Sequence, residues 1–330
     1  MNPKRKRLFF NLLGLFLSGL FLYLCFRSLD KESLKSVFLL PKPWVLAAVI
    51  VCNFILMGFR TEMWRLLLKP LGKTPFFFLF DVLHVGTMAN TLLPLKAGEF
   101  FRATFVSKKY NYRYTQVLTT VGLERYFSGF SLLLVFLLVT SYLNVPLWLK
   151  TSAYVLGAIL IGVQLSLMVL WKKKPNLEKW EKRHPAIYRT IEFLFHVGEG
   201  SHSLRSLPSF LTLVLLGLVT WAIQGAMLKT VEYAFNVTLP WIPTLFVLVA
   251  INLAIALPSA PGNIGTFEFA AVLAYKWLQI DKPTALGVAF YFHFLQAIPM
   301  TLVGLFYYFR WGLRLKDLEE AEVKKVEAMP

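Results

Sequence analysis

Residues 258–265, Pro258-Ser259-Ala260-Pro261-Gly262-Asn263-Ile264-Gly265, decide the fold because they interrupt an apolar stretch that runs from Ile242 to Leu278. A second apolar stretch, Phe76–Ser107, is interrupted in the same way by Pro94-Leu95-Lys96-Ala97-Gly98. Each limb has about 10–18 residues, fewer than the ~20 that a helix needs to cross the hydrocarbon core. Broken backbone at membrane depth is tolerated only where it is buried in protein or lines a cavity. Each pair of limbs is therefore predicted to form a re-entrant hairpin of two short helices.

The remaining apolar residues fall into six blocks of near-spanning length. These blocks are Leu8–Phe26, Trp44–Phe59, Val117–Thr140, Leu147–Trp171, Phe210–Val231 and Thr284–Phe309. The 330 residues are 57% hydrophobic and only 16% charged, whereas a soluble domain is usually about 45–50% apolar. The predicted fold class is an all-α polytopic membrane protein with two inverted-topology halves, six full spans and two re-entrant broken-helix hairpins.

The distribution of positive charge predicts the orientation. The net charge is +17, and the basic residues lie in short runs between the apolar blocks. That pattern gives no basic face with interleaved aromatics, so nucleic acid is excluded as a partner. With the amino terminus in the cytoplasm, cytoplasmic segments carry 26 Lys and Arg residues and external segments carry 8. The positive-inside rule then predicts a multi-pass protein of the cytoplasmic (plasma) membrane with both termini cytoplasmic.

The order span, span, hairpin, span occurs twice along the chain. Because each half crosses the membrane three times, the two halves are predicted to be inverted relative to each other, as in many transporters whose site lies near the midplane. The predicted parts are a first half, 1–143, with hairpin 76–107; a second half, 144–310, with cytoplasmic loop 172–208 and hairpin 242–278; and a charged cytoplasmic tail, 311–330.

Ionisable side chains inside a membrane cost about 2.5–3.5 kcal/mol each on insertion scales, which makes them default candidates for function. Glu99 and Arg102 follow the first break and stand three residues apart, so they can share a helix face. One interpretation is that backbone N–H groups of the half-helix, aided by Arg102, hold a phosphate. The alternative is that Glu99 only caps its half-helix while Arg102 extends to the cytoplasmic surface.

Two further groups of residues carry the same kind of ambiguity. After the second break, Gly262 and Gly265 expose backbone N–H groups, Thr266 is a candidate N-cap, and Glu268 follows; the alternative is a turn with a capped helix. Glu124-Arg125 lies within an apolar span, and adjacent residues project about 100° apart on a helix. These two side chains are expected to have different partners, and a structural inter-helix ion pair is the alternative to a site.

Motifs of enzymes are incomplete or missing. Gly72-Lys73-Thr74 matches the end of a nucleotide-binding P-loop, but Leu67 occupies the position of its first glycine. No His-Glu-x-x-His, Gly-x-Ser-x-Gly or paired-cysteine metal pattern occurs, and Cys25 and Cys52 lie inside apolar blocks. We therefore expect no catalytic residues, no cofactor and no metal. Arg60 and Arg65 are interpreted as positive-inside anchors, and His293 as a satisfied interior histidine.

The chain resembles the flippase-like transmembrane family named after the membrane region of lysylphosphatidylglycerol synthase, the multiple-peptide-resistance factor. The matching pieces are Asn90-x3-Pro94-x3-Gly98-Glu99-x2-Arg102, Glu124-Arg125 and Pro258-x2-Pro261-Gly262-x2-Gly265-Thr266-Phe267-Glu268, within a similarity that covers roughly residues 8–310. The resemblance implies eight or so membrane segments and translocation of lipids, among them aminoacylated phosphatidylglycerol. Ser128 stands where the family often has an acid. We also expect the aminoacyl-transferase domain of the full synthase to be absent, because only a short tail follows the last span.

The predicted function is a lipid flippase or scramblase that moves an anionic or aminoacylated phospholipid, or a lipid-linked headgroup, across the membrane. A membrane-embedded transferase that uses Glu124 or Glu268 as a base, and a non-transporting partner subunit, are the alternatives. The expected partner is the lipid itself, with a second copy of the chain or a synthase as candidate protein partners. The expected substrate-binding residues are Asn90, Gly98, Glu99, Arg102, Glu124, Arg125, Gly262, Gly265, Thr266 and Glu268.

Overall fold

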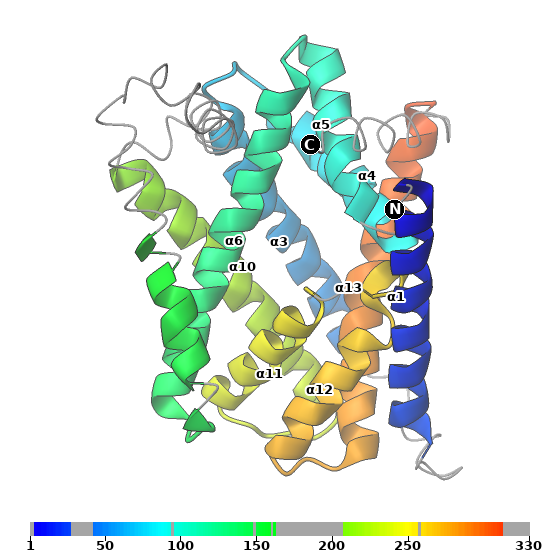
Figure 1. Ribbon diagram of the computed structural model, residues 1–330, viewed down its shortest axis with the longest axis vertical. Helices are drawn as coiled ribbons and strands as arrows, with labels where there is room; N and C mark the ends of the chain where they lie inside the picture. Colours follow the sequence, from blue (N-terminus) through cyan, green and yellow to red (C-terminus); the bar gives the residue numbers. More distant parts are fainter. Residues whose placement is uncertain are drawn as a thin grey trace. The chain divides into compact units, whose positions relative to one another are not determined.

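The computed structural model describes residues 3–27, 42–93, 96–147, 150–159, 161–162, 207–256 and 259–312, with side chains from Leu15 onward. These residues form an all-helical structure (Figure 1). Its elements are α1 (Pro3–Phe26), α3 (Pro43–Leu68), α4 (Phe76–Leu92), α5 (Ala97–Tyr110), α6 (Tyr114–Tyr142), α10 (Leu207–Ala234), α11 (Trp241–Ala254), the 3-10 helix η3 (Pro261–Asn263), α12 (Thr266–Trp277) and α13 (Lys282–Arg310).

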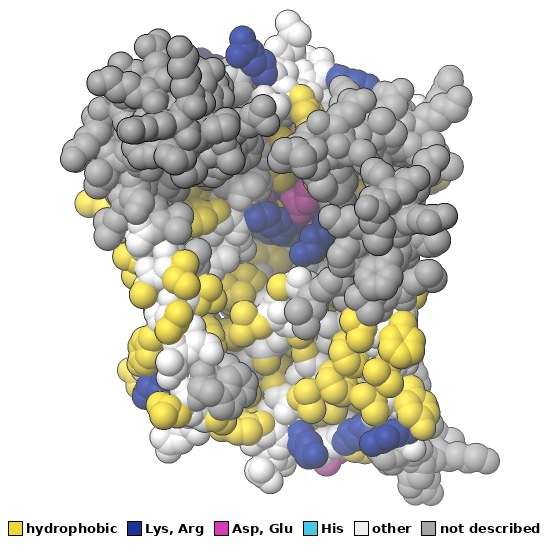
Figure 2. All heavy atoms as spheres, in the orientation of Figure 1, with side chains coloured by type: hydrophobic (Ala, Val, Ile, Leu, Met, Phe, Trp, Pro, Cys, Tyr) yellow, Lys and Arg dark blue, Asp and Glu magenta, His cyan; other side chains and the backbone are white. Residues whose placement is uncertain are grey.

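Four of the described helices are long and apolar enough to cross a membrane: α3, α6, α10 and α13. Each contains one of the predicted spans, and the predicted span Leu8–Phe26 lies within α1. Many large apolar side chains of these long helices are exposed, among them Ile55, Leu215 and Phe309, and Figure 2 shows apolar side chains mainly on the lower half of the visible face. Exposed apolar surface on long helices is what contact with lipid requires, so the prediction of a multi-pass membrane protein is supported.

The two interrupted stretches are broken where the sequence predicts. The first divides into α4 and α5, and the second into α11 and α12 with η3 between them. The limbs have 17, 14, 14 and 12 residues, which corresponds to about 18–26 Å of helix, less than the ~30 Å core. The re-entrant course of these limbs and the inverted topology stay predictions.

The chain divides into two compact units. Unit 1 contains Met1–Gly58, Asp81–Arg102 and Trp221–Pro330, and unit 2 contains Phe59–Phe80 and Ala103–Thr220. Both helix breaks lie in unit 1. The predicted halves 1–143 and 144–310 follow the order of the elements along the chain, whereas the two units follow the contacts between residues. The division into halves therefore stays a prediction.

Unit 1 is built around α12, which packs against α11, α13 and α1. Phe21 of α1 stacks on Phe269 of α12 with ring centroids 4.6 Å apart. The α1 hydroxyl of Ser18 accepts a 2.9 Å hydrogen bond from the backbone N–H of Ala260, just before η3. Helix α1 therefore packs directly against the residues that form the second break.

Unit 2 has an apolar core shared by the last turns of α3, the middle of α6 and the first turns of α10. Met63, Phe127 and Leu213 are members of this core. The Trp64 indole donates a 3.0 Å hydrogen bond to the Thr120 hydroxyl, and both side chains are fully buried. Burial of a Trp with its N–H satisfied fixes the end of α3 against α6.

Several predicted features lie partly or wholly outside the described residues. They are the far end of the predicted span 147–171, most of the cytoplasmic loop 172–208, most of the tail 311–330, and Pro94, Leu95 and Pro258 in the breaks.

Candidate functional site

The first break is closed by a chain of polar side chains on α4 and α5. Asn90, near the end of α4, accepts a 2.9 Å hydrogen bond from the Gly98 N–H and donates one of 3.3 Å to Glu99 Oε1. The other carboxylate oxygen of Glu99 pairs with Arg102 at 2.8 Å. Glu99 and Arg102 therefore share a helix face, as the spacing predicts, and form an ion pair that Asn90 extends across the break.

Arg102 is buried, with 1% of its surface exposed. A side chain that extended to the membrane surface would be exposed, so the alternative interpretation of Arg102 is wrong. A buried guanidinium is held only if a carboxylate and further acceptors compensate its desolvation. Glu99 provides that carboxylate.

Two glycines make this arrangement possible. A Cβ atom on Gly98 would lie 1.8 Å from the carbonyl oxygen of Gly86, and one on Gly86 would lie 2.6 Å from Cγ of Arg102. The backbones of α4 and α5 therefore touch at this pair, and the stem of Arg102 lies in the space that Gly86 leaves. Any side chain at either position forces the two limbs apart.

The second break uses left-handed backbone instead. Gly262 has φ 68°, Asn263 has φ 59° and Gly265 has φ 87°. The first residue of α12 is Thr266, and its N-cap is Gly265, whose N–H donates a 2.7 Å hydrogen bond to Glu268 Oε2. The prediction that Thr266 is the N-cap is wrong, because the carboxylate of Glu268 satisfies the end of the helix from its third position.

Glu268 has a second partner that the sequence did not predict. Nδ1 of His293, on α13, lies 2.6 Å from Glu268 Oε1, and Nε2 lies 2.8 Å from the Gly262 carbonyl oxygen. A carbonyl can only accept, so Nε2 carries a hydrogen. One proton then lies between Nδ1 and Oε1, on either atom, so the pair is neutral overall. His293 is indeed buried among aromatics, stacked on Phe267, but its role is to join Glu268 to the backbone of the break.

The two breaks lie side by side in unit 1. A Cβ atom on Gly262 would lie 3.4 Å from the carbonyl oxygen of Thr91, in the last turn of α4. Helix α13 packs closely on α4, because a Cβ atom on Gly304 would lie 2.6 Å from the carbonyl oxygen of His84. Polar groups of both interrupted helices are thereby brought into one region of the protein.

Unit 1 also contains a buried acid that the sequence analysis missed. Glu232, near the end of α10, is fully buried. Its carboxylate accepts hydrogen bonds from the Thr244 hydroxyl at 2.6 Å and the Tyr275 hydroxyl at 2.9 Å, and pairs with Lys229 at 3.2 Å. Lys229 also donates to the carbonyl of Leu239. Glu232 was overlooked because it stands at the end of an apolar block, where a charge is expected to be exposed; nothing local marks it as buried.

Glu124 and Arg125 lie in unit 2. Glu124 is 2% exposed and pairs with Arg60 of α3 at 3.1 Å. The interpretation of Arg60 as only an anchor is incomplete, since it compensates a buried carboxylate. Arg125 is exposed, although it lies about 17 Å from the start of a helix that is about 43 Å long. An exposed cation at the middle of an apolar helix is the most unusual feature of α6.

The predicted site residues therefore fall into two groups. The residues that the structure brings together in unit 1 are Asn90, Gly98, Glu99, Arg102, Gly262, Gly265, Thr266 and Glu268. Glu124 and Arg125 belong to unit 2. The described residues contain no cluster of three or more His, Cys, Asp or Glu that could hold a metal ion.

Long apolar helices, interrupted helices and buried charges define a multi-pass α-helical membrane protein. Residues 11–304 match the family described as the lysylphosphatidylglycerol synthase TM region, and the chain belongs to this family. A UPF0104 membrane protein from Methanocaldococcus jannaschii is 26% identical over 224 residues, which are 65% of this chain and 90% of that protein. The family connects the chain with membrane lipid metabolism or transport.

Proposed function

We propose that the protein is a flippase or scramblase that moves an anionic or aminoacylated phospholipid, or a lipid-linked headgroup, across the cytoplasmic membrane. The observation that carries the proposal is the meeting of two broken helices in unit 1, with Arg102, Glu99 and the Glu268–His293 pair buried there. Paired broken helices are the sites at which transporters bind substrate. Ionisable side chains buried within a membrane are costly and are therefore default candidates for a substrate site.

The chemical task of such a site is to replace the hydration of the headgroup while the acyl chains stay in the bilayer. A desolvated phosphate without partners costs several kcal/mol or more. The guanidinium of Arg102 is a donor for a phosphate, and Glu99 and Glu268 can balance charge or receive an amine; the N–H groups of Gly98 and Gly265 already bond Asn90 and Glu268. Thr266, a residue with 2% of its surface exposed, adds a buried hydroxyl that has no hydrogen-bond partner among the described residues.

Arg125 is the second element of the proposal. A cation at this depth of a spanning helix costs about 2.5–3.5 kcal/mol if it meets lipid tails. Its exposed position on α6 supports a role toward a phosphate that passes along that helix. Glu124, paired with Arg60, would then stabilise α6 against α3 rather than bind the lipid.

The test is movement of a fluorescent phosphatidylglycerol in proteoliposomes, read by dithionite quenching. With wild-type protein, the lipid of the inner leaflet should become accessible to dithionite; protein-free liposomes should keep it protected. Arg125→Gln should reduce the rate at least tenfold and Arg125→Lys should restore part of it. Arg113→Gln is the matched control, because Arg113 is also exposed and precedes the same helix.

Two results would contradict the proposal. One is unchanged lipid movement in Arg125→Gln together with Glu268→Gln, both folded. The other is a change in the chemical identity of the lipid headgroup during the assay, detected by mass spectrometry, which would favour the transferase.

The orientation is proposed from the charge bias alone. A cysteine that replaces Tyr142, an exposed residue at the end of α6, should react with an impermeant thiol reagent from outside. A cysteine that replaces Lys108 should react only after permeabilisation, in a background without Cys25 and Cys52. The reverse pattern would place both termini outside.

A further inference from the structure

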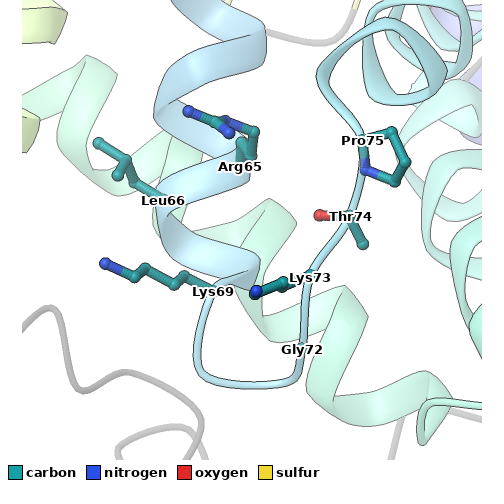
Figure 3. Close-up of a pocket in the computed structure, with 7 residues that line it drawn as sticks. All are labelled: Arg65, Leu66, Lys69, Gly72, Lys73, Thr74 and Pro75. Atoms are coloured by element: carbon teal, nitrogen blue, oxygen red, sulfur yellow. The ribbon is translucent and has the colours of Figure 1, made fainter.

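Unit 2 contains a basic pocket where the chain turns from α3 into α4. It has a volume of about 440 Å³, within the range of small-molecule sites. Figure 3 shows the residues that line it: Arg65, Leu66, Lys69, Gly72, Lys73, Thr74 and Pro75. Three of these seven are basic and none is acidic, and all of them belong to unit 2.

The turn that forms the pocket depends on Gly72. Its φ is 149°, and a Cβ atom there would lie 2.2 Å from the hydroxyl oxygen of Tyr112. The Tyr112 ring, stacked on Tyr110 with centroids 5.7 Å apart, therefore supports the loop from behind. With the loop held, Lys73 and Thr74 stand opposite the last turn of α3, as Figure 3 shows.

The charge in the pocket is only partly compensated. Arg65 forms two 2.7 Å hydrogen bonds to the carboxylate of Glu62, one turn earlier on α3. Among the described residues, neither Lys69 nor Lys73 forms an ion pair with a carboxylate, so the pocket contains two basic side chains whose charge no acid compensates.

A second and independent feature indicates a ligand. Thr74 is 7% exposed, and its hydroxyl makes no hydrogen bond to any other described residue. Figure 3 shows this oxygen pointing from the loop toward α3, on the side of the basic residues. A buried hydroxyl without a partner is costly unless another group, such as a bound oxygen, satisfies it.

We propose that this pocket binds a phosphate group, with the ammonium groups of Lys69 and Lys73 and the Thr74 hydroxyl as donors and Arg65 at its edge. The residues Gly72-Lys73-Thr74 are those that resembled the end of a nucleotide P-loop. Here Pro75 separates them from α4, and Leu67 lies inside α3, so they form a different anion site rather than a nucleotide loop. This site is separate from the broken-helix site and goes beyond the proposed lipid movement.

The phosphate can belong to a lipid headgroup or to a soluble phosphate compound. At 1.5 Å per residue, Arg65 lies about 33 Å from the start of α3, just past the ~30 Å hydrocarbon core. The pocket is therefore at the depth of lipid headgroups if α3 spans the bilayer. The chemistry is the same for both sources, and the choice of probe separates them.

The experiment measures binding to the full-length protein in detergent at low salt. The probes are dihexanoyl-phosphatidylglycerol, dihexanoyl-phosphatidylcholine and inorganic phosphate. Lys73→Gln and Thr74→Val should each weaken binding about tenfold, the effect of losing one hydrogen bond to a charged group, while Thr74→Ser should bind like wild type. Lys108→Gln is the charge-matched control, an exposed lysine of unit 2 outside the pocket.

A separate readout distinguishes this role from a purely structural one. Because the Thr74 hydroxyl has no partner without ligand among the described residues, Thr74→Val should not lower the melting temperature of the ligand-free protein. It should, however, remove the increase in melting temperature that the probe causes.

Binding of phosphatidylglycerol without inorganic phosphate assigns the site to a lipid headgroup, and the opposite preference assigns it to a soluble phosphate; both support the proposal. Equal weakening by Lys108→Gln would show only general surface charge and overturn it. Absence of binding for all three probes, or unchanged binding in Lys73→Gln, would also overturn it. Lipid movement through the broken-helix site can fail or succeed independently of each of these results.

Discussion

The two helix breaks of unit 1 solve the same problem by different means. Each must hold irregular backbone and an acid at the start of a short helix. At the first break, side chains close the gap: Asn90 bonds Gly98 and Glu99, and Glu99 bonds Arg102. At the second, the backbone turns through left-handed residues, and Glu268 bonds the backbone N–H of Gly265 and a histidine from another helix.

The two breaks differ most in the basic side chain that pairs with the acid, which is Arg102 at the first break and His293 at the second. An arginine side chain keeps its charge in proteins, so the buried Arg102 needs Glu99 as its counterion. The Glu268–His293 pair shares one proton and is neutral whichever group holds it. The first break is therefore a fixed ion pair, whereas the second can be made entirely from neutral groups. Substitutions at matched positions of the two breaks should therefore have different effects.

The largest expected effect is a matched Glu→Gln change at each break. Glu99→Gln leaves Arg102 buried without its carboxylate, and should cost about 3–5 kcal/mol of unfolding free energy. Glu268→Gln should cost only about 1–2 kcal/mol, because a glutamine can still accept from the Gly265 N–H and donate to Nδ1 of His293.

Chemical unfolding in detergent measures both, and the double variant Glu99→Gln with Arg102→Gln should recover much of the loss. Equal losses for the two single variants would mean that the second break also needs a fixed charge pair.

The second expectation compares one glycine of each break. Gly98→Ala places a Cβ atom 1.8 Å from the backbone oxygen of Gly86, so the two limbs must separate, at a cost of about 3 kcal/mol. In Gly262→Ala the new Cβ atom lies at an ordinary contact distance of 3.4 Å from the Thr91 carbonyl oxygen. The expected cost is therefore only the strain of a left-handed alanine, about 1 kcal/mol of unfolding free energy. Thermal unfolding of the two purified variants tests this order, and a larger loss for Gly262→Ala would reverse the comparison.

The third expectation separates two asparagines that occupy similar positions before the breaks. Asn90→Ala removes the acceptor of the Gly98 N–H and should cost about 1–3 kcal/mol. Asn252 instead donates a 2.8 Å hydrogen bond back to the Leu248 carbonyl of its own helix, so Asn252→Ala should cost less than about 1 kcal/mol. Similar losses would indicate that Asn252 also supports its break.

The smallest expected effect on stability is that of Thr266→Val. The Thr266 hydroxyl is buried and lacks a hydrogen-bond partner in the described part of the chain, so its removal should change stability by less than about 0.5 kcal/mol. If the hydroxyl binds a headgroup, lipid movement should fall several-fold at unchanged stability. Thr266→Ser is the control that keeps the hydroxyl, and a stable Thr266→Val variant with normal lipid movement would remove Thr266 from the site.

Sequence patterns predicted the breaks themselves because proline and glycine act on the backbone locally. The helices end at Leu92 and Ala254 and resume at Ala97 and Thr266. The second gap contains the whole predicted interruption 258–265, whereas α5 already begins within the predicted interruption 94–98. The pairing of Glu99 with Arg102 was predictable for the same reason, since three residues along one helix fix their separation. Long apolar blocks likewise predicted α3, α6, α10 and α13, because length and hydropathy alone decide whether a helix can span.

Contacts between distant segments could not be predicted in this way. Glu124 and Arg60 are 64 residues apart, and Glu268 and His293 are 25 apart on different helices. Glu232 depends on Thr244 and Tyr275, which come from α11 and α12. Nothing in the residue types or their spacing selects these partners among the other polar side chains of the chain.

The sequence by itself determined that this chain is helical and enters a membrane, and where its helices are broken, since backbone geometry and hydropathy are local properties. The tertiary structure alone decided which charges neutralise one another, because that depends on which helix faces come into contact. It also decided that Gly72, Lys73 and Thr74 line a pocket with Arg65 and Lys69. The sequence shows the three residues, but only the fold places α3 opposite them.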